Sequence, residues 1–434
     1  MSEVTKNLFI PTNVWYGDDK LELTFPESWH LDVVRMTGHD SPPLSDDQIR
    51  FSFSNPIGSK KISELTEGKE TVVILFDDMS RPTPCHVVVP HVIEELHKGG
   101  IKDDNIQFIA AIGNHRVMTH FDYVKKLGEE IVENYPVDNH NPFHNLIEVG
   151  TTQYDNRIEL NRDFIESDLK IGIGGIKSHG FVGYGGGAKI ILPGVSSCNT
   201  IVFNHIDIGG FGPGTRPKPF TGPGKVKSNL MRYDMEEAAR LGGLDCKVDI
   251  VTNNNREPVG LFIGDFVEEH RVGCKFSNEV HSFENIPKEA DIVIDNTYPD
   301  GSGRVSTRSY TANALKQGGT MVIVDMFPES ILPHFLVSAR LERARSIRFE
   351  DEQPPKLWRE PSRPMHQRVG KCILLSNHQS KRARASIGPD ENVVGVKTWE
   401  DALEELKNLH EKEARVAIFP YGRLEHPKYP EEWI

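Results

Sequence analysis

Polar side chains able to do chemistry follow an apolar run at residues 71–76. They are two adjacent carboxylates, a hydroxyl and a guanidinium: Asp77, Asp78, Ser80 and Arg81. A carboxylate can hold a ribose, and a planar guanidinium can clamp a carboxylate or phosphate with two hydrogen bonds. The same residues would also suit an Asx turn with a surface ion pair, so this segment alone leaves both interpretations open.

Two histidines stand in similar positions. His115 lies in the sequence Gly-Asn-His-Arg, directly after a second apolar run at 106–113. An imidazole there can act as general acid or base near neutral pH, or it can simply hydrogen-bond to the loop backbone. His205 follows Lys189 by sixteen residues. A neutral imidazole is a good ligand for nickel, copper or zinc, although a lone histidine is more often structural.

The most distinctive segment is a glycine-rich stretch that runs from His179 to Lys189. Its glycines at 183, 185, 186 and 187 permit close backbone approach to a ligand, and their N–H groups can hold a phosphate. The stretch is neither a Walker A motif nor GxGxxG, so the ordinary nucleotide fingerprints do not apply. The lysine at its end could reach the same ligand by charge or by covalent attachment. The alternative is a flexible surface loop.

These residues must be positioned by alternating strands and helices. The first 30 residues predict two strands around a turn at 17–19. Further strands are predicted at 71–76, 106–113 and 169–176, with helical patterns between them. This alternation is typical of an α/β fold with a mainly parallel sheet, in which ligands collect at the carboxyl ends of the strands. The candidate residues of this half of the chain all follow predicted strands.

The pattern restarts near residue 270, with strands predicted at 290–296, 318–326 and 371–377. We therefore expect two α/β domains with mainly parallel sheets and an active site in the cleft between them. Residues 1–270 would form the N-terminal cofactor-binding and catalytic domain, and residues 271–411 a C-terminal α/β domain closing the substrate cleft. The strand-like piece at 415–422 would bring residues 412–434 back to the first domain.

Composition narrows the class of protein. The 434 residues carry a formal net charge of -13, which argues against a nucleic-acid partner because such binding needs a basic face. The five cysteines form no CxxC pair, which favours a reducing compartment. No signal-like N-terminus and no run of about 18 apolar residues is apparent. We expect a cytoplasmic enzyme without a membrane partner. The sequence does not determine the oligomeric state, and a homo-oligomer is one possibility.

Taken together, the segments resemble those of the nickel-pincer-nucleotide-dependent lactate racemase family. That family has a DDxTRP-like loop, a GxHR turn, a histidine ten residues before a lysine, and another histidine sixteen residues after it. This chain has DDMSRP at 77–82, GNHR at 113–116, and the series His179, Lys189 and His205. The likeness is strongest over the first half, and the length and two-domain layout also fit.

The resemblance implies an isomerase, a racemase or epimerase acting on a 2-hydroxy acid. Lys189 would covalently tether the nickel-pincer nucleotide, pyridinium-3,5-bisthiocarboxylic acid mononucleotide nickel, which separate maturation proteins make. His205 would bind its nickel. His115 and His179 would be the acid/base residues on opposite sides of the substrate carbon, and Arg81 would bind the substrate carboxylate. The residues holding the nucleotide would be Asp77, Asp78, Ser80, Gly185, Gly186 and Gly187.

The chain departs from the family pattern in its second half. The family has a Tyr-Gln-x-x-Lys group after its Gly-Tyr-Pro turn, and no such group follows the turn at 296–300 here. The substrate-binding candidates of this region are Tyr298, Arg304 and Arg308. We therefore expect a substrate other than lactate, with a second carboxylate or a longer polyhydroxy chain.

Two other functions stay open at this point. One is a zinc-dependent hydrolase with His115, His179 and His205 as metal ligands, which leaves the glycine-rich lysine segment unexplained. The other is a non-catalytic nucleotide-binding homologue, against which the intact pair His115 and His179 argues.

Overall fold

The computed structural model describes residues 5–211, 216–300, 305–307, 309–329, 365–410 and 413–434. The chain forms two compact units. The larger unit contains residues 40–280 and 429–434, and the smaller unit contains the described residues before 40 and between 281 and 428. The expected mixed α/β fold with mainly parallel sheets is confirmed in both units. The expected position of the active site between two domains stays a prediction.

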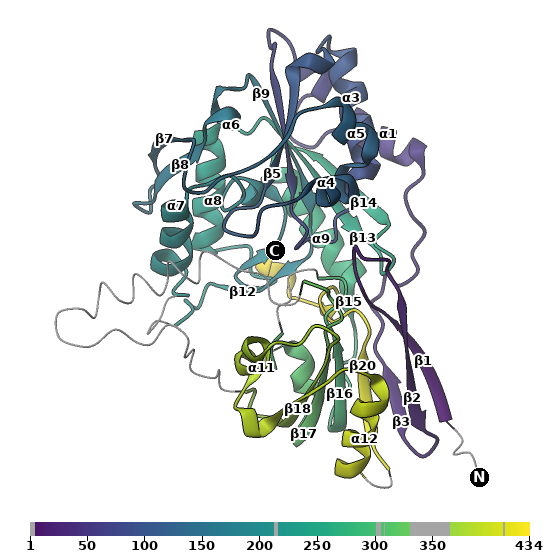
Figure 1. Ribbon diagram of the computed structural model, residues 1–434. Coiled ribbons are helices and arrows are strands. Elements are labelled where there is room, and N and C mark those ends of the chain that lie inside the picture. Colours follow the sequence, from purple (N-terminus) through teal and green to yellow (C-terminus); the bar gives the residue numbers. More distant parts are fainter. Residues whose placement is uncertain (1–4, 212–215, 301–304, 308, 330–364, 411–412) are drawn as a thin grey trace, which may run out of the picture. The chain divides into compact units, whose positions relative to one another are not determined.

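The sheet of the larger unit has a central run of parallel strands (Figure 1). Its order is β14 (Pro258–Gly264), β13 (Cys246–Thr252), β9 (Leu169–Gly175), β4 (Val72–Asp77), β5 (Ile106–Ala111) and β6 (Val137–Asn139). The strands from β13 to β6 are parallel, and β14 runs antiparallel at the edge. Every residue of β4 is buried, as an apolar run in the middle of a covered parallel sheet requires. The predicted strands β4, β5 and β9 are confirmed, whereas β13 and β14 were not predicted.

Helices and short strands complete the larger unit. The helices are α1 (Asp46–Ser54), α2 (Ile62–Leu65), α3 (Cys85–Lys98), α4 (His120–Leu127), α5 (Glu129–Asn134), α6 (Arg162–Glu166), α7 (Cys198–Val202), α8 (Leu230–Gly242) and α9 (Glu268–His281). The short strands are β7 (Leu146–Thr151), β8 (Arg157–Asn161), β10 (Ser178–His179), β11 (Val182–Tyr184) and β12 (Gly222–Pro223). Helix α3 buries Val88, Val92 and Leu96, a four-residue spacing that places them on one helical face.

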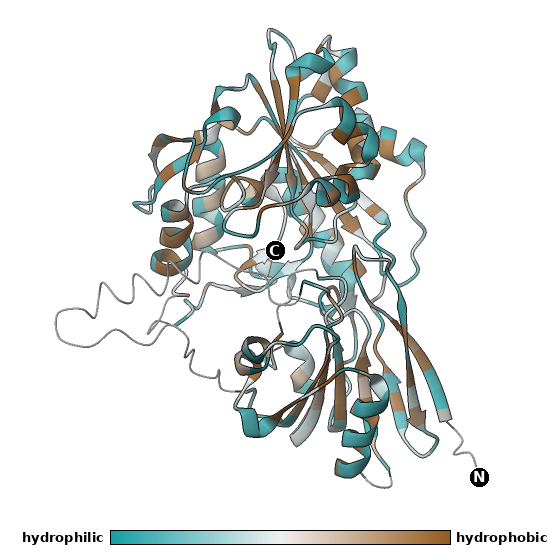
Figure 2. Ribbon diagram, in the orientation of Figure 1, coloured by the Kyte–Doolittle hydropathy of each residue, from teal (hydrophilic) through white to brown (hydrophobic). Residues whose placement is uncertain are grey.

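The smaller unit has its own parallel sheet. The order is β19 (Val393–Val396), β18 (Val369–Leu375), β17 (Leu315–Val324), β16 (Ala290–Asn296), β20 (Arg415–Phe419) and β3 (His30–Val33). Its helices include α11 (Lys381–Ile387) and α12 (Trp399–Leu409), and the hairpin of β1 (Thr5–Pro11) and β2 (Lys20–Pro26) packs into the same core. Figure 2 shows the apolar residues concentrated along the strands of both sheets.

The structure corrects the predicted domain boundaries. Strand β20 pairs with β16 and β3, so the strand expected to return to the first domain belongs to the smaller unit. The hairpin and β3 belong there too, and only residues 429–434 join the larger unit. There the Val226 N–H donates to the Trp433 carbonyl at 2.7 Å. An apolar run predicts a buried strand equally well in either sheet, so the sequence pattern could not identify its neighbour.

In the part of the chain that the structure describes, no helix combines the length and the apolar character needed to cross a membrane.

Candidate active site

A small cavity lies at the carboxyl ends of β4, β5 and β9, where the sequence placed the candidate residues. Its volume is about 50 Å³, room for a few water-sized groups. Side chains and backbone from all three strand ends line it: Asp77, Asp78, Arg81, Ala111, Ile112, His115, Gly174, Gly175, Gly186, Lys189, Ile190, Pro193, Gly194 and Lys247. The structure thus brings Asp78, Arg81, His115 and Lys189 to one place although they span 112 positions of the sequence.

Asp78 and His115 form a close carboxylate–imidazole pair. The His115 Nδ1 lies 2.5 Å from Asp78 Oδ2, and the Ser80 hydroxyl donates to Asp78 Oδ1 at 2.5 Å. Burial alone would raise the pKa of Asp78, but the charge and hydrogen bond of His115, with Arg81 and Ser80, hold it well below its usual range. Asp78 is therefore a charged acceptor that keeps a proton on Nδ1 of the imidazole.

Asp77 belongs to a second ion pair, with the fully buried Lys126. Lys126 of α4 donates to Asp77 Oδ1 at 2.6 Å, to the Arg81 carbonyl at 2.9 Å and to the Thr83 carbonyl at 3.2 Å. The Thr83 hydroxyl donates to Asp77 Oδ2 at 2.6 Å. Asp77 lines the cavity, yet both of its oxygens hold the loop that carries Arg81 in place. Sequence reasoning missed Lys126, because a single lysine on a helix gives no sign of its burial.

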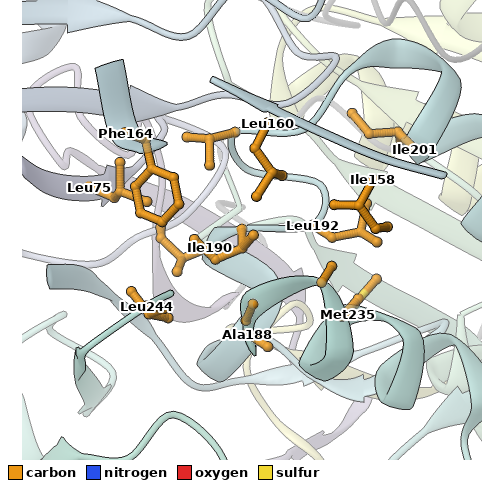
Figure 3. Close-up of a cluster of buried hydrophobic side chains, with 14 of the residues drawn as sticks. Leu75, Ile158, Leu160, Phe164, Ala188, Ile190, Leu192, Ile201, Met235 and Leu244 are labelled. Carbon is orange, nitrogen blue, oxygen red and sulfur yellow. The ribbon is translucent and has the colours of Figure 1, made fainter. Parts of the chain in front are cut away.

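Lys189 stands on a turn that the core holds on both sides. The turn η2 (Gly187–Ile190) begins after Gly186, whose φ of 74° favours glycine. Ala188 and Ile190 are buried in the apolar cluster of Figure 3, whereas Lys189 lines the cavity. The apolar residues on either side therefore fix the backbone from which the lysine extends.

The glycine-rich segment is held by the protein's own buried groups. Arg232 of α8, which is fully buried, donates to the carbonyls of Val182, Tyr184 and Gly186. Burial lowers the pKa of Arg232 to about 10. The Gly187 N–H donates to Asp249 at 2.5 Å. Residues 182–188 are therefore packed into the protein, and Gly186 and Lys189 line the cavity, in contrast to the flexible loop considered from the sequence.

The reason for three of the glycines is steric. A Cβ on Gly186 would lie 2.6 Å from Asp249 Oδ2, and one on Gly187 would lie 2.8 Å from His270 Cγ. A Cβ on Gly185 would lie 3.0 Å from the Gly175 carbonyl. These glycines let the backbone approach neighbouring protein groups, and of the three only Gly186 lines the cavity. Whether Gly185 and Gly187 also touch a nucleotide stays a prediction.

His179 and His205 meet around a different residue, Phe181. The Phe181 ring lies edge-on to His179, with centroids 5.6 Å apart, and to His205 at 6.1 Å, and it stacks on Phe211 at 3.8 Å. His205, on the π-helical turn η3 (Phe203–Ile208), is buried, and its Nδ1 lies 3.0 Å from the Ile201 carbonyl. That bond places the proton on Nδ1, so the neutral ring carries its lone pair on Nε2.

The two groups of candidate residues are thus organised separately. As far as the described residues define it, the lining of the cavity includes His115 but neither His179 nor His205. Among the described residues, no three His, Cys, Asp or Glu side chains converge on a point that could hold a metal ion. The three-histidine arrangement that a zinc hydrolase would need is therefore not supported.

The substrate-binding candidates of the second half lie in the smaller unit or outside the described residues. Tyr298 is buried, and its hydroxyl donates to Asp18 at 2.9 Å. Arg304 and Arg308 lie outside the described residues.

Comparisons with known proteins identify relatives of the chain. The family model of the lactate racemase N-terminal domain matches residues 16–210. The chain is 29% identical over 372 residues to the lactate racemase of Thermoanaerobacterium thermosaccharolyticum, covering 81% of this chain and 84% of the relative. It is 34% identical over 281 residues to the lactate racemase of Lactiplantibacillus plantarum, covering 64% of this chain and 65% of the relative.

Solved structures share the fold over most of the chain. The lactate racemase apoprotein of T. thermosaccharolyticum superposes with a TM-score of 0.71 at 24% identity, covering 98% of this chain and all of that one. A protein from Thermotoga maritima superposes with a TM-score of 0.61 at 20% identity, covering 89% of this chain and 99% of that one. At these identities the superpositions bear on the fold alone.

The fold and the cavity define an α/β enzyme that gathers a carboxylate–imidazole pair and several cations at the ends of parallel strands. The sequence matches go further: residues 16–210 match the lactate racemase N-terminal domain, and the two relatives are lactate racemases, which are isomerases. The family resemblance read from the sequence is confirmed, and homology supports a racemase function.

Proposed function

We propose that the protein interconverts the configurations of a 2-hydroxy acid and that it uses a nickel-pincer nucleotide tethered to Lys189. The observation that carries this proposal is the shared cavity of Asp78, Arg81, His115 and Lys189. It combines an oriented acid/base, a guanidinium suited to a carboxylate and an amine that can be covalently modified.

The residues present fit the proposed cofactor in two respects. Glycine backbone at 174, 175, 186 and 194 lines the cavity around Lys189, so a flat group attached there could approach the main chain closely. His205 offers Nε2 as a single nitrogen donor. One protein ligand suffices for a nickel ion whose other ligands are the cofactor's own donors, which accords with the lack of a multi-residue metal cluster among the described residues.

When bound, the nucleotide would supply an electron-poor ring that accepts a hydride, a capacity that amino-acid side chains lack. The chain's residues would handle binding and proton transfer. Arg81, from which no described carboxylate lies within ion-pair distance, would bind the substrate carboxylate. His115 would remove the hydroxyl proton at Nε2, because Asp78 holds the proton on Nδ1.

A second base is needed because the two enantiomers place their hydroxyl groups on different sides of the carbon. We assign this role to His179, whose Nδ1 accepts a hydrogen bond from the Phe181 N–H at 3.3 Å. In the neutral ring this bond leaves the proton on Nε2 and the lone pair on Nδ1. His179 would therefore accept the hydroxyl proton at Nδ1, exchanging its backbone bond for one to the substrate, whereas His115 would use Nε2.

The proposed substrate is a 2-hydroxy acid other than lactate. Its support is the sequence after residue 296, where the Tyr-Gln-x-x-Lys group of the family is missing. Tyr298 donates its hydroxyl proton to Asp18, so toward a substrate it would act as an acceptor unless that bond breaks. We further propose a cytoplasmic protein whose partners are the proteins that make and deliver the cofactor.

The test is to produce the protein together with the cofactor-making proteins and to measure bound nickel and the mass of the peptide containing Lys189. We expect nickel near one ion per chain and a nucleotide-sized adduct on Lys189. Lys189→Arg is the matched control, since it keeps the charge but cannot form the link. An unmodified Lys189 without nickel, under conditions that load a known family member, would remove the proposal. Screening chiral 2-hydroxy acids with the loaded protein would then identify the substrate.

A further inference from the structure

A second lysine, Lys247 on β13, reaches the same cavity from the core. Its side chain is fully buried and lines the cavity together with Lys189. Strand β13 runs parallel to β9, with Lys247 opposite Gly172 and Asp249 opposite Gly174. A fully buried lysine is rare, and it requires compensation by charge and hydrogen bonds.

The glycines of β9 make room for this lysine. A Cβ on Gly172 would lie 3.1 Å from Lys247 Cδ, and a Cβ on Gly174 would lie 3.1 Å from Lys247 Nζ. Glycine inside a strand weakens the strand and often marks the close approach of another group. Here the Lys247 side chain is an approaching group at both glycines, joined at Gly172 by Ile190 Cγ2 at 2.9 Å, and it passes over β9 to the cavity.

Asp249 fixes the ammonium and the Lys189 turn together. Lys247 Nζ donates to Asp249 Oδ1 at 2.5 Å, and the Gly187 N–H donates to Asp249 Oδ2 at 2.5 Å. Burial and the charge of Asp249 raise the pKa of neighbouring Glu269 well above its usual range, which disfavours the charged form of that carboxyl. Asp249 is therefore the acid that balances Lys247.

A comparison with Lys126 shows what distinguishes Lys247. Both lysines are fully buried and both pair with an aspartate. Lys126 donates to three acceptors, one for each of its N–H groups. Lys247 donates to two among the described residues, Asp249 Oδ1 and the Val248 carbonyl at 3.1 Å. Only Lys247 lines the cavity, so its third N–H is available to a ligand there.

We infer that Lys247 is an anion-binding residue of the cavity and donates its third N–H to a carboxylate or phosphate oxygen of the bound ligand. The inference rests on the proposed function for the source of that oxygen, which is either the tethered nucleotide or the hydroxy acid. In both cases the ligand meets a cation that Asp249 has already fixed in place.

The first test uses the full chain without cofactor and titrates inorganic phosphate, with binding followed by calorimetry and by the thermal midpoint. We expect wild type to bind phosphate and Lys247→Met to bind it about ten- to a hundredfold more weakly, as befits one lost hydrogen bond to a charged group. Lys170→Met removes one positive charge at the other end of β9 and should bind like wild type. Equal binding by wild type and Lys247→Met, or no phosphate binding by wild type, would overturn the inference.

Loss of Lys247 leaves Asp249 buried without its cation, and the single variant could therefore fold poorly. The double variant K247M and D249N removes both charges, and the asparagine carbonyl can still accept the Gly187 N–H. It should fold and still bind phosphate weakly. Phosphate binding at wild-type strength by the folded double variant would contradict the inference.

Production with the cofactor-making proteins then identifies the source of the oxygen. Loss of the Lys189 adduct in Lys247→Met would point to the nucleotide, and an intact adduct with KM raised about tenfold or more would point to the hydroxy acid. If adduct and KM both match wild type, the role of Lys247 is refuted. If wild-type Lys189 stays unmodified, the proposed function fails, and the phosphate titration still decides the role of Lys247.

Discussion

Charged residues lie at the carboxyl ends of both parallel sheets, but those of the larger unit lie beside a cavity and the pair of the smaller unit is packed into protein. In the larger unit, Asp78 pairs with His115 beside a cavity. In the smaller unit, Asp295 at the end of β16 accepts from Arg423 at 3.1 and 3.2 Å and from Ser309 at 3.1 Å. A Cβ on Gly422 would lie 2.3 Å from Asp295 Oδ1, so that space is already filled.

The difference teaches that an ionic cluster at strand ends is not sufficient evidence for a site. Asp295 and Arg423 satisfy one another inside packed protein, as a structural ion pair must. Around the cavity, by contrast, Arg81 and Lys247 keep hydrogen-bonding capacity that described protein groups do not use. Unused donors facing a cavity are therefore a better guide to a ligand site than charge alone.

The largest expected effect is on chemistry in the larger unit. His115→Gln keeps an N–H donor for Asp78 but cannot exchange protons. We expect kcat to fall by about 10²–10⁴-fold, the usual contribution of a general acid or base, with little change in the thermal midpoint. Steady-state kinetics on the loaded enzyme would measure it. A kcat of His115→Gln within tenfold of wild type would mean that another residue transfers the proton. The cluster of Asp78 and His115 would then differ less from the structural ion pair of Asp295 and Arg423.

In the smaller unit, the expected effect is on stability. Arg423→Met leaves Asp295 buried without its cation, which should lower the free energy of unfolding by about 3–5 kcal/mol. The double variant R423M and D295N should recover most of this loss in urea unfolding. The contrast would break if kcat of Arg423→Met fell more than tenfold while its stability matched wild type, because this ion pair would then serve catalysis.

A smaller expected effect is a difference in how the stability contributions of Asp325, in the smaller unit, and Asp78, in the larger unit, depend on pH. Asp325 follows β17, accepts from the Thr297 hydroxyl at 3.0 Å, and burial raises its pKa to about 6. An acid whose pKa is raised on folding stabilises the fold below its unfolded pKa of about 4, and this contribution of about 3 kcal/mol is lost as the pH rises through 6. Asp78, whose pKa is lowered, contributes above about pH 4 and loses its effect only in stronger acid.

Asp325→Asn should therefore remove a change in stability between pH 4.5 and pH 7. We expect the variant to gain stability relative to wild type as the pH rises across this interval. Urea unfolding of both proteins at several pH values would measure this gain. A constant difference between Asp325→Asn and wild type would mean that Asp325 does not titrate in this range.

The smallest expected effect concerns the hydroxyl donor beside the proposed catalytic pair, Asp78 and His115. Ser80→Ala removes the hydroxyl that bonds Asp78 at 2.5 Å. We expect a loss of about 1 kcal/mol in unfolding free energy and a decrease of less than tenfold in kcat/KM, because His115 still holds Asp78. Ser309→Ala, which removes a donor from Asp295, should cost similar stability without affecting kinetics. A large kinetic effect of Ser309→Ala would erase the distinction between the two clusters.

Much of the larger sheet could be predicted from the sequence because its strands are short, buried apolar runs that end in polar residues. The apolar runs at 71–76 and 106–113 predicted two strands, and the polar residues that follow them predicted the edge of the sheet where the cavity lies. The glycine-rich segment predicted close backbone approach to a ligand, and the structure shows close approach to protein groups, with a positive φ at Gly186.

The remainder depends on contacts between distant residues. Nothing near Lys126, Arg232 or Lys247 in the sequence indicates which carboxylate or carbonyl each will meet. Strand β20 looks the same whether it enters one sheet or the other. His179 and His205 meet around Phe181 and neither is among the cavity-lining residues, an arrangement that no spacing in the sequence distinguishes from a shared site.

The buried guanidinium of Arg232 has a consequence for the order of assembly. It holds three carbonyls of the glycine-rich segment with groups that belong to the polypeptide itself. These bonds need no prosthetic group, so the folded chain can hold the segment in this conformation by itself. On the proposed function, the cofactor would be attached to an already folded protein that presents Lys189 as the acceptor, and newly made chains would accumulate in folded form until the cofactor became available.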